Sequence, residues 1–179
     1  GFNDAHNTTQ EYAALVSAAY DAAKKVDPHA RIGMSVASFD APYLDQAILA
    51  QAKAGKANHF DYLCIHPYET LEGLKDIDGE NKYHWMSKML GDALKADAPE
   101  KADVPIWITE VGMPVEKKVT ETDAAKAVVK AYAMAIAQGI AKVMWFEGRD
   151  PAGEQGGFGL IDRQGKPRAS FSSFKTMTA

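Results

Sequence analysis

The sequence predicts an α/β fold with a parallel sheet, and two observations carry this prediction. Segments with helical periodicity alternate with short apolar runs, in the order helix, then strand and helix four times over. Such alternation implies parallel strands joined by right-handed crossovers. The apolar runs are also nearly continuous, as is typical of strands buried on both faces. With 179 residues, of which 46% are hydrophobic, we expect residues 1–179 to form a single domain with a substantial core.

Composition excludes several classes of function. The net charge is -4 and no basic stripe is present, so we expect no nucleic-acid partner. The longest apolar runs are shorter than a membrane span, so we expect no membrane partner. The five histidines show no metal-ligand spacing, and neither a metal nor another cofactor is expected. Cys64 is the only cysteine and lies in an apolar run, which predicts a small buried residue. No signal peptide is visible, and the compartment stays open, with a secreted or periplasmic location slightly favoured.

A first helix is predicted from Thr8 to Asp27. Thr8-Thr9-Gln10-Glu11 matches a capping box, with a hydroxyl and a Glu three residues apart. Asp27-Pro28 ends the helix, because a residue before proline disfavours helical backbone. The apolar residues at helical spacing, which we expect to pack, are Tyr12, Leu15, Val16, Ala19, Tyr20 and Ala23.

Two strands and two more helices follow. Residues 31–38 form the next predicted strand, and Asp40 with Pro42 caps a helix over 43–54 that Gly55 ends. Residues 60–65 are the second strand. A long polar connection over 69–83 precedes a helix over 84–95, and connections of that length are often functional.

The run Val104 to Pro114 is a short strand that ends on a carboxylate. Alternation places Ile106, Ile108 and Glu110 on one face, and Trp107 and Thr109 on the other, where we expect Trp107 to pack between strand and helix. A carboxylate in this position is costly to bury unless it is hydrogen-bonded, paired or used chemically. Glu110 therefore caps the next turn, pairs with an arginine or has a chemical role.

The last third contains two helices and one strand. Thr120 or Thr122 caps a helix that ends at Gln138-Gly139, and residues 141–146 form the fourth strand. A Gly-rich loop over 147–159, an extended piece with a turn over 160–167, and a helix over 170–176 complete the chain. The apolar positions expected to be buried on the longer helix are Ala125, Val128, Val129, Tyr132, Ala133 and Ile136.

Polar and aromatic side chains gather where the strands end. In a parallel sheet these carboxyl ends share one rim, where barrel and doubly wound enzymes place their active sites. The candidate residues are Ser38, His66, Tyr68, Glu110, Trp145 and Glu147.

Several motifs on this rim resemble clan A glycoside hydrolases, which are (β/α)8 barrels, with family 39-like and family 5-like members the most similar. The run 107–112 (Trp-Ile-Thr-Glu-Val-Gly) resembles their seventh strand, which ends on the nucleophile. The motifs His66-Pro67-Tyr68 and Trp145-Phe146-Glu147 are similar to the ends of their sixth and eighth strands. The runs 157–162 (Gly-Phe-Gly-Leu-Ile-Asp) and 11–33 resemble the tail after strand eight and the passage from helix four into strand five.

This resemblance covers nearly the whole chain but only the C-terminal half of a barrel, strands five to eight with their helices. It implies a retaining glycosidase acting on a carbohydrate, with Glu110 as nucleophile. It also implies substrate contacts from His66, Tyr68, Trp145 and Glu147. The family's acid/base is a Glu after an Asn, and this chain has Phe2-Asn3-Asp4, so Asp4 is a possible but less favoured stand-in. The preferred source is the N-terminal half of the barrel, and either that half or a second copy of the chain would complete the fold.

Other interpretations stay open. The chain could be a non-catalytic carbohydrate-binding remnant of such a barrel, or inactive by itself. A different parallel α/β enzyme is disfavoured, because no Gly-rich phosphate loop and no Gly-x-Ser-x-Gly elbow follows any strand. His66 could instead hold a loop at the rim, Trp145 could be a packing residue, and Trp85 could be a subsite wall or an anchor. Arg149 could donate to Glu110, pair with Glu147 or contact substrate.

Overall fold

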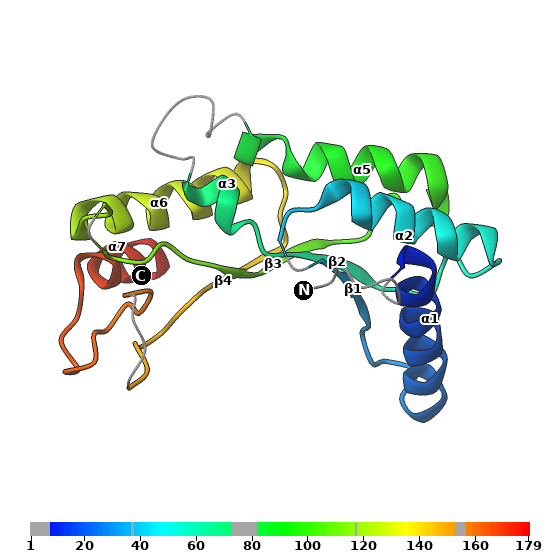
Figure 1. The fold of residues 1–179 in the computed structure, drawn as a ribbon, viewed down its shortest axis with the longest axis horizontal. Helices are drawn as coiled ribbons and strands as arrows, with labels where there is room; N and C mark the ends of the chain where they lie inside the picture. Colours follow the sequence, from blue (N-terminus) through cyan, green and yellow to red (C-terminus); the bar gives the residue numbers. More distant parts are fainter. Residues whose placement is uncertain (1–7, 37, 73–81, 117, 153–156) are drawn as a thin grey trace. The chain divides into compact units, whose positions relative to one another are not determined.

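The computed structural model describes residues 8–36, 38–72, 82–116, 118–152 and 157–179. It confirms an α/β fold with four parallel strands, hydrogen-bonded in the order β1-β2-β3-β4 (Figure 1). The elements are α1 Thr9–Val26, β1 Gly33–Ser35, α2 Ala41–Lys53, β2 Tyr62–Ile65, α3 Tyr68–Glu72, α5 Met86–Asp97, the 3-10 helix η2 Pro99–Lys101, β3 Ile106–Val111, α6 Glu121–Ala137, β4 Lys142–Trp145 and α7 Ala169–Thr178. Within the described ranges, no helix combines the length and the apolar character needed to cross a membrane.

The chain divides into two compact units. Unit 1 comprises Gly1–Ile65 and Met86–Trp107, and unit 2 comprises His66–Trp85 and Ile108–Ala179. Strand β3 therefore begins in unit 1 and ends in unit 2.

In unit 1, α1 begins as predicted but buries a face that only partly matches the expected one. Thr8 accepts a hydrogen bond from Glu11 N–H, and the Glu11 carboxylate accepts from Thr8 N–H at 2.9 Å, which completes the capping box. The buried side chains include Ala13 and Ser17, whereas Leu15 is 67% exposed. The expected face is only partly right. Val16 is buried as expected, but small and polar side chains also make the contact with α2. Gln51, 1% exposed, donates to Ser17 Oγ at 3.0 Å.

Two polar anchors tie α1 to the sheet of unit 1. Tyr12 Oη donates to the Ser35 carbonyl at 2.6 Å and accepts from Ser35 N–H at 2.7 Å. Asp61, just before β2, pairs with Lys24 at 3.0 Å and accepts from Ile32 N–H at 2.8 Å. These contacts fix where the first strand starts.

Aromatic packing joins β2 and the start of β3 within unit 1. The rings of Tyr62 and Trp107 stack with centroids 3.9 Å apart, and the Arg31 guanidinium lies 5.2 Å from the Trp107 ring centroid. Trp107 was expected between strand and helix. It instead stacks on the neighbouring strand, because Gly33 on β1 has no side chain to displace the Tyr62 ring.

In unit 2, α6 and α7 pack side by side (Figure 1). Thr120, the first of the two predicted caps, accepts from Asp123 N–H at 3.1 Å. The expected face of α6 is only partly right, because Val129 and Ile136 are 43% and 73% exposed. The buried side of α6 consists mainly of alanines, whose small side chains let neighbouring elements pack close to the helix. The buried positions are Ala124, Ala127, Val128, Ala131 and Ala135.

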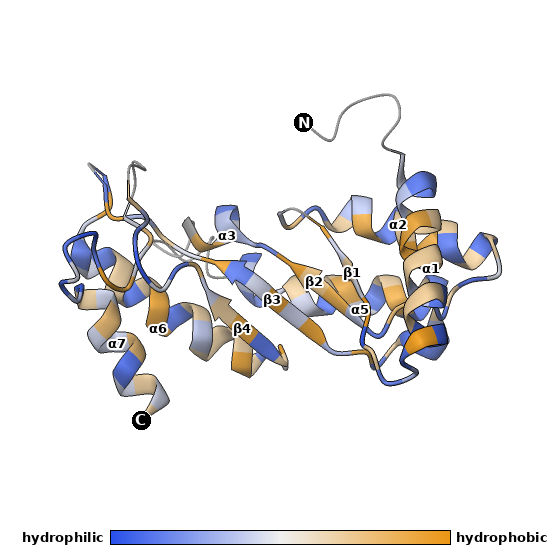
Figure 2. Cartoon of the chain, turned by 90° about the horizontal axis from the view of Figure 1, so that it is seen from below, coloured by the Kyte–Doolittle hydropathy of each residue, from blue (hydrophilic) through white to orange (hydrophobic). Residues whose placement is uncertain are grey.

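Strand β4 departs from the expectation of burial on both faces. Lys142 and Met144 are exposed, and Figure 2 shows hydrophilic and hydrophobic residues side by side along this strand. The cause is visible in the sequence, since the apolar run over 141–146 contains a lysine.

Candidate active site

Glu110 is the last residue but one of β3, and its carboxylate is half exposed and hydrogen-bonded. The side chain is 45% exposed, and its Oε2 accepts a hydrogen bond of 3.1 Å from Tyr68 Oη. Tyr68 is the first residue of α3, which follows β2 after a two-residue connection. The adjacent strand end therefore supplies the phenol, and within the described residues Glu110 forms no ion pair with an arginine.

His66 lies between Thr109 and Glu110. Its Nε2 is 2.8 Å from Thr109 Oγ1, and its Nδ1 is 3.9 Å from Glu110 Oε2. The contact with Thr109 orients the ring, so that the second nitrogen faces the carboxylate oxygen that Tyr68 also contacts. Tyr68 thus donates a hydrogen bond to Glu110 Oε2, and the second nitrogen of His66 lies 3.9 Å from the same oxygen.

The Tyr68 ring is enclosed by two phenylalanines. Its centroid lies 6.3 Å from that of Phe146 and 6.1 Å from that of Phe158, both edge-on. Burial among these rings raises the pKa of the Tyr68 phenol, and so do the hydrogen bond to Glu110 and the negative charges of Glu110 and Glu147. Tyr68 therefore stays protonated as a hydrogen-bond donor throughout the neutral range.

Backbone contacts bring the ends of β3 and β4 together. Phe146 N–H donates to the Val111 carbonyl at 2.8 Å, and the following peptide bond, Phe146–Glu147, is cis. A β-carbon on Gly112 would collide with the Phe146 carbonyl oxygen, so glycine is required there. The glycine of the Thr-Glu-Val-Gly run thus brings the β4 exit close to Glu110.

The other residues predicted for the site make no direct hydrogen bond to Glu110 among the described contacts. Glu147 is half-buried and close enough to Tyr68 to affect its pKa. Trp145 is half-buried at the end of β4, and its Nε1 is buried without a hydrogen-bond partner among the described residues. Asp4 lies outside the described residues, and Ser38 belongs to unit 1.

The expectation for Arg149 is corrected, whereas the two alternatives for Trp85 stay open. Arg149 donates to the Arg163 carbonyl at 3.0 Å and is exposed, so it is held within its own loop. It was named as a donor to Glu110 or a partner of Glu147, and the turn over 160–167 offers it a nearer acceptor. Trp85 is 51% exposed and makes an edge contact with His84.

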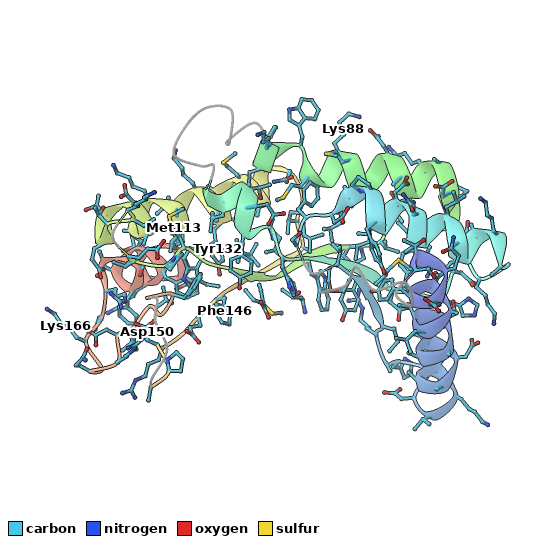
Figure 3. The ribbon with its side chains drawn as sticks, in the orientation of Figure 1. Lys88, Met113, Tyr132, Phe146, Asp150 and Lys166 are labelled. Carbon is cyan, nitrogen blue, oxygen red and sulfur yellow. The ribbon has the colours of Figure 1, made fainter. Side chains whose placement is uncertain are left out.

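Sequence reasoning missed a buried ion-pair network beside this site. Asp150 is 5% exposed and pairs with Arg168 at 2.6 Å, and Arg168 also pairs with Glu121 at 2.6 Å. Phe146 and Asp150 both lie on the segment that leaves β4 (Figure 3). The partners are 18 and 47 residues apart, so only the glycines at 157 and 159 hinted at close backbone packing here.

In the described part of the chain, the candidate residues belong neither to a metal-binding cluster nor to the groove found in unit 1. Across the described ranges, no group of three or more His, Cys, Asp or Glu side chains is arranged to hold a metal ion. A groove of about 820 Å³ lies in unit 1 between α1 and α2, with Ala13, Ala14 and Ala50 in its wall. It contains none of the candidate residues.

Comparison with solved structures shows that the fold is similar to that of a glycoside hydrolase. A glycoside hydrolase family 17 β-1,3-glucanosyltransferase from Rhizomucor miehei matches with a TM-score of 0.57 and 15% identity, over 89% of this chain and 55% of that one. A β-glucuronidase from an uncultured Clostridium sp. has a TM-score of 0.48 and 11% identity, over 93% and 36% of the two chains. A GH5_18 protein from Bifidobacterium longum subsp. infantis has a TM-score of 0.44 and 20% identity, over 98% and 53%.

No protein-family model and no curated protein sequence matches the chain. The chain spans about one third to just over one half of the length of the structures it resembles. The family 17 match is a likeness of fold, and it is consistent with half of a (β/α)8 barrel.

Proposed function

We propose that the protein is a glycoside hydrolase that cleaves O-glycosidic bonds of oligo- or polysaccharides by a retaining double displacement, with Glu110 as nucleophile. The observation that carries the proposal is the state of the Glu110 carboxylate. One oxygen is engaged by Tyr68 and faces His66, while the side chain remains 45% exposed at a strand end. An ionised, oriented and accessible carboxylate is what nucleophilic attack on a sugar requires.

The chemistry assigns one role to each oxygen. Oε1 attacks the anomeric carbon, the glycosidic bond breaks, and the leaving oxygen takes a proton from an acid. Water then hydrolyses the glycosyl ester of Glu110, with the same acid group now acting as base. Tyr68 and His66 stabilise the negative charge on Oε2 before attack and again when the carboxylate leaves.

Three further residues are proposed to contact the sugar. Glu147 can accept hydrogen bonds from sugar hydroxyls, and Trp145 offers an apolar face to sugar C–H groups. His66 can donate to a hydroxyl beside the reacting carbon as well as facing Glu110. The half-buried state of all three is compatible with these roles.

The acid/base is assigned to a carboxyl group about 5–5.5 Å from Glu110, the spacing of retaining enzymes. Its preferred source is the N-terminal half of a barrel, with a second copy of this chain or Asp4 as alternatives. The match to only 55% of the family 17 structure supports a further half, because that structure contains additional chain.

The test uses the complete protein and a panel of dinitrophenyl glycosides, whose good leaving groups need little acid assistance. We expect Glu110→Gln to lower turnover by roughly 10³-fold or more. A 2-deoxy-2-fluoro glycoside of the accepted sugar should add one glycosyl unit to Glu110, detected by peptide mass. Near-normal turnover by Glu110→Gln would rule out the nucleophile, and oligosaccharide binding without turnover would identify a carbohydrate-binding remnant.

A further inference from the structure

A partly buried ion-pair network, in which one carboxylate is 2% exposed and the other 43% exposed, links the exit of β4 to α6 and to the start of α7. It consists of Glu121, Asp150 and Arg168, and we call it the Arg168 clamp. Arg168 Nη2 contacts Asp150 Oδ2 and its Nη1 contacts Glu121 Oε1, both at 2.6 Å. The side chains of Asp150 and Arg168 are 2% and 17% exposed. The clamp thus joins the exit of β4, the first turn of α6 and the residue before α7.

The second oxygen of each carboxylate holds backbone. Asp150 Oδ1 accepts from Gly159 N–H at 2.7 Å, and Glu121 Oε2 accepts from Ala169 N–H at 3.0 Å. All four carboxylate oxygens are therefore used. Arg168 is suited to this position because its planar fork binds two carboxylates at once, which the single ammonium of lysine does not reproduce.

Gly159 connects the clamp to the candidate site. Its neighbour Phe158 accepts from Glu147 N–H at 3.2 Å, and Leu160 N–H donates to the Glu147 carbonyl at 2.9 Å. The Phe158 ring packs edge-on against Tyr68 and Phe146. Holding Gly159 therefore fixes both the ring beside Tyr68 and the backbone of Glu147.

The two neighbouring glycines leave room for the clamp. A β-carbon on Gly157 would lie 2.7 Å from Arg168 Nη2, and one on Gly159 would collide with the backbone of Asp150. Burial alone would lower the pKa of Arg168, but the hydrogen bonds and charges of Asp150 and Glu121 raise it. The guanidinium therefore stays charged, and loss of the Asp150 carboxylate leaves it paired only with the more exposed Glu121.

We propose that Arg168 is a positioning residue for the candidate site, acting through Asp150 and Gly159 to hold Phe158 against Tyr68 and to fix Glu147. The consequence for substrate rests on the proposed glycosidase function. The positioning itself does not, because it concerns contacts among residues of this chain.

The test is nuclear magnetic resonance of the 179-residue chain labelled with ¹³C-tyrosine. The ring signal of Tyr68 is assigned by its loss in Tyr68→Phe, and its shift reports the edge-on rings of Phe158 and Phe146. We expect Arg168→Lys to move or broaden this signal in a chain whose circular dichroism is unchanged. Arg149→Lys is the matched control, since the Arg149 side chain donates to the exposed Arg163 carbonyl and not to the clamp, and it should leave the signal in place.

Two more variants separate positioning from general loosening. Glu121→Gln leaves the Asp150 arm intact and should move the Tyr68 signal less than Arg168→Lys does. Asp150→Asn serves if Arg168→Lys does not fold, and it should move the signal as Arg168→Lys would. An unmoved Tyr68 signal in a folded Arg168→Lys or Asp150→Asn chain overturns the proposal, as does an equal shift in Glu121→Gln.

In the complete enzyme, Arg168→Lys should raise KM for an aryl glycoside by a larger factor than it lowers kcat. Glu147 depends on the clamp, whereas Glu110 is carried by β3. The two proposals can fail separately. A moved Tyr68 signal together with an active Glu110→Gln enzyme would support the positioning role of Arg168 and rule out Glu110 as the nucleophile. An unmoved Tyr68 signal together with an inactive Glu110→Gln enzyme would rule out the positioning role and support the nucleophile.

Discussion

The carbonyl oxygen of Phe146 occupies the position that a β-carbon on Gly112 would need. The same two segments share the hydrogen bond from Phe146 N–H to the Val111 carbonyl at 2.8 Å. Glu110 lies two residues before this contact and Glu147 directly after it, so the closeness of the two backbones decides how near these side chains can come.

Replacing Gly112 by alanine should destabilise the protein, because the added methyl group forces the two segments apart. Overpacking of this kind costs about 1–3 kcal/mol in the free energy of unfolding. Gly91→Ala is the control. Gly91 lies in α5 with open space around its Cα, so the same change should be neutral or stabilising by about 0.5–1 kcal/mol. Urea unfolding of both variants measures the difference, and a Gly112→Ala chain as stable as Gly91→Ala would contradict the predicted collision.

Tyr68→Phe should impair catalysis while preserving the fold. The change removes the hydrogen bond to Glu110 Oε2 but keeps the ring against Phe146 and Phe158. A hydrogen bond to a charged group contributes about 1.5–3 kcal/mol, so turnover of the complete enzyme should fall roughly 10- to 100-fold.

The matched control for this change is Tyr83→Phe, in the same unit. Tyr83 is fully buried, and its hydroxyl donates to the Ala131 carbonyl at 3.2 Å, away from Glu110. Tyr83→Phe should lower stability and leave turnover of the folded protein unchanged. Equal kinetic losses in the two variants would mean that the Tyr68 hydroxyl has no specific role.

Thr109 should determine which nitrogen of His66 carries the proton in the neutral ring. If Thr109 Oγ1 donates to Nε2, the proton lies on Nδ1 and points towards the Glu110 carboxylate 3.9 Å away, which is the electrostatically favoured arrangement. Long-range ¹H–¹⁵N correlation spectra distinguish the two tautomers. We expect the Nδ1–H form in the native chain and in Thr109→Ser, and a shift towards Nε2–H in Thr109→Val. An Nε2–H ring in the native chain would reverse the donor assignment.

Asp61 should make stability depend on pH in the acid range. Burial alone would raise the pKa of Asp61, but hydrogen bonds from Ile32 N–H and Lys24 and the Lys24 charge outweigh it and lower the pKa. The stabilisation is therefore complete above the unfolded-state pKa of about 3.9, and it is lost as the pH falls through the lower folded-state value. Asp61→Asn should lower the free energy of unfolding by about 1–3 kcal/mol at neutral pH, and by progressively less in acid.

A surface pair provides the comparison for Asp61. Asp92 pairs with Lys88 on the exposed side of α5, where Lys88 is labelled in Figure 3. Exposed pairs contribute little, so Asp92→Asn should change the free energy of unfolding far less than Asp61→Asn does, and by a similar amount at each pH. A pH-independent loss in Asp61→Asn would show that packing, and not charge, accounts for its effect.

Local signals in the sequence located most elements correctly. The Thr8–Glu11 capping box, the Asp40-Pro42 start of α2 and the Thr120 cap need only neighbouring residues, and all three are present. The alternation of strands and helices along the sequence was enough to predict that the carboxyl ends of the strands share one edge of the sheet. His66, Tyr68 and Glu110 could therefore be expected close together. Their contact depends on the parallel arrangement of adjacent strands.

The buried faces of the helices and the ion pairs between distant residues could not be predicted from the sequence, for a physical reason. Hydrophobic periodicity favoured Leu15 and Ile136, yet contact between close-packed helices selects small side chains such as Ala13 and Ala131. The pairing of Arg168 with Asp150 and Glu121 depends on chain folding over tens of residues, and many other charged residues offered equivalent partners.

The division of the chain into two units has a spectroscopic consequence. Of the three tryptophans, Trp107 belongs to unit 1, whereas Trp85 and Trp145 belong to unit 2. A chain carrying Trp85→Phe and Trp145→Phe would emit from Trp107 alone, in its stack with Tyr62. Its fluorescence would follow the melting of unit 1, while circular dichroism follows all helices. Coincident curves would mean one cooperative transition, and separated curves would mean that each unit melts by itself.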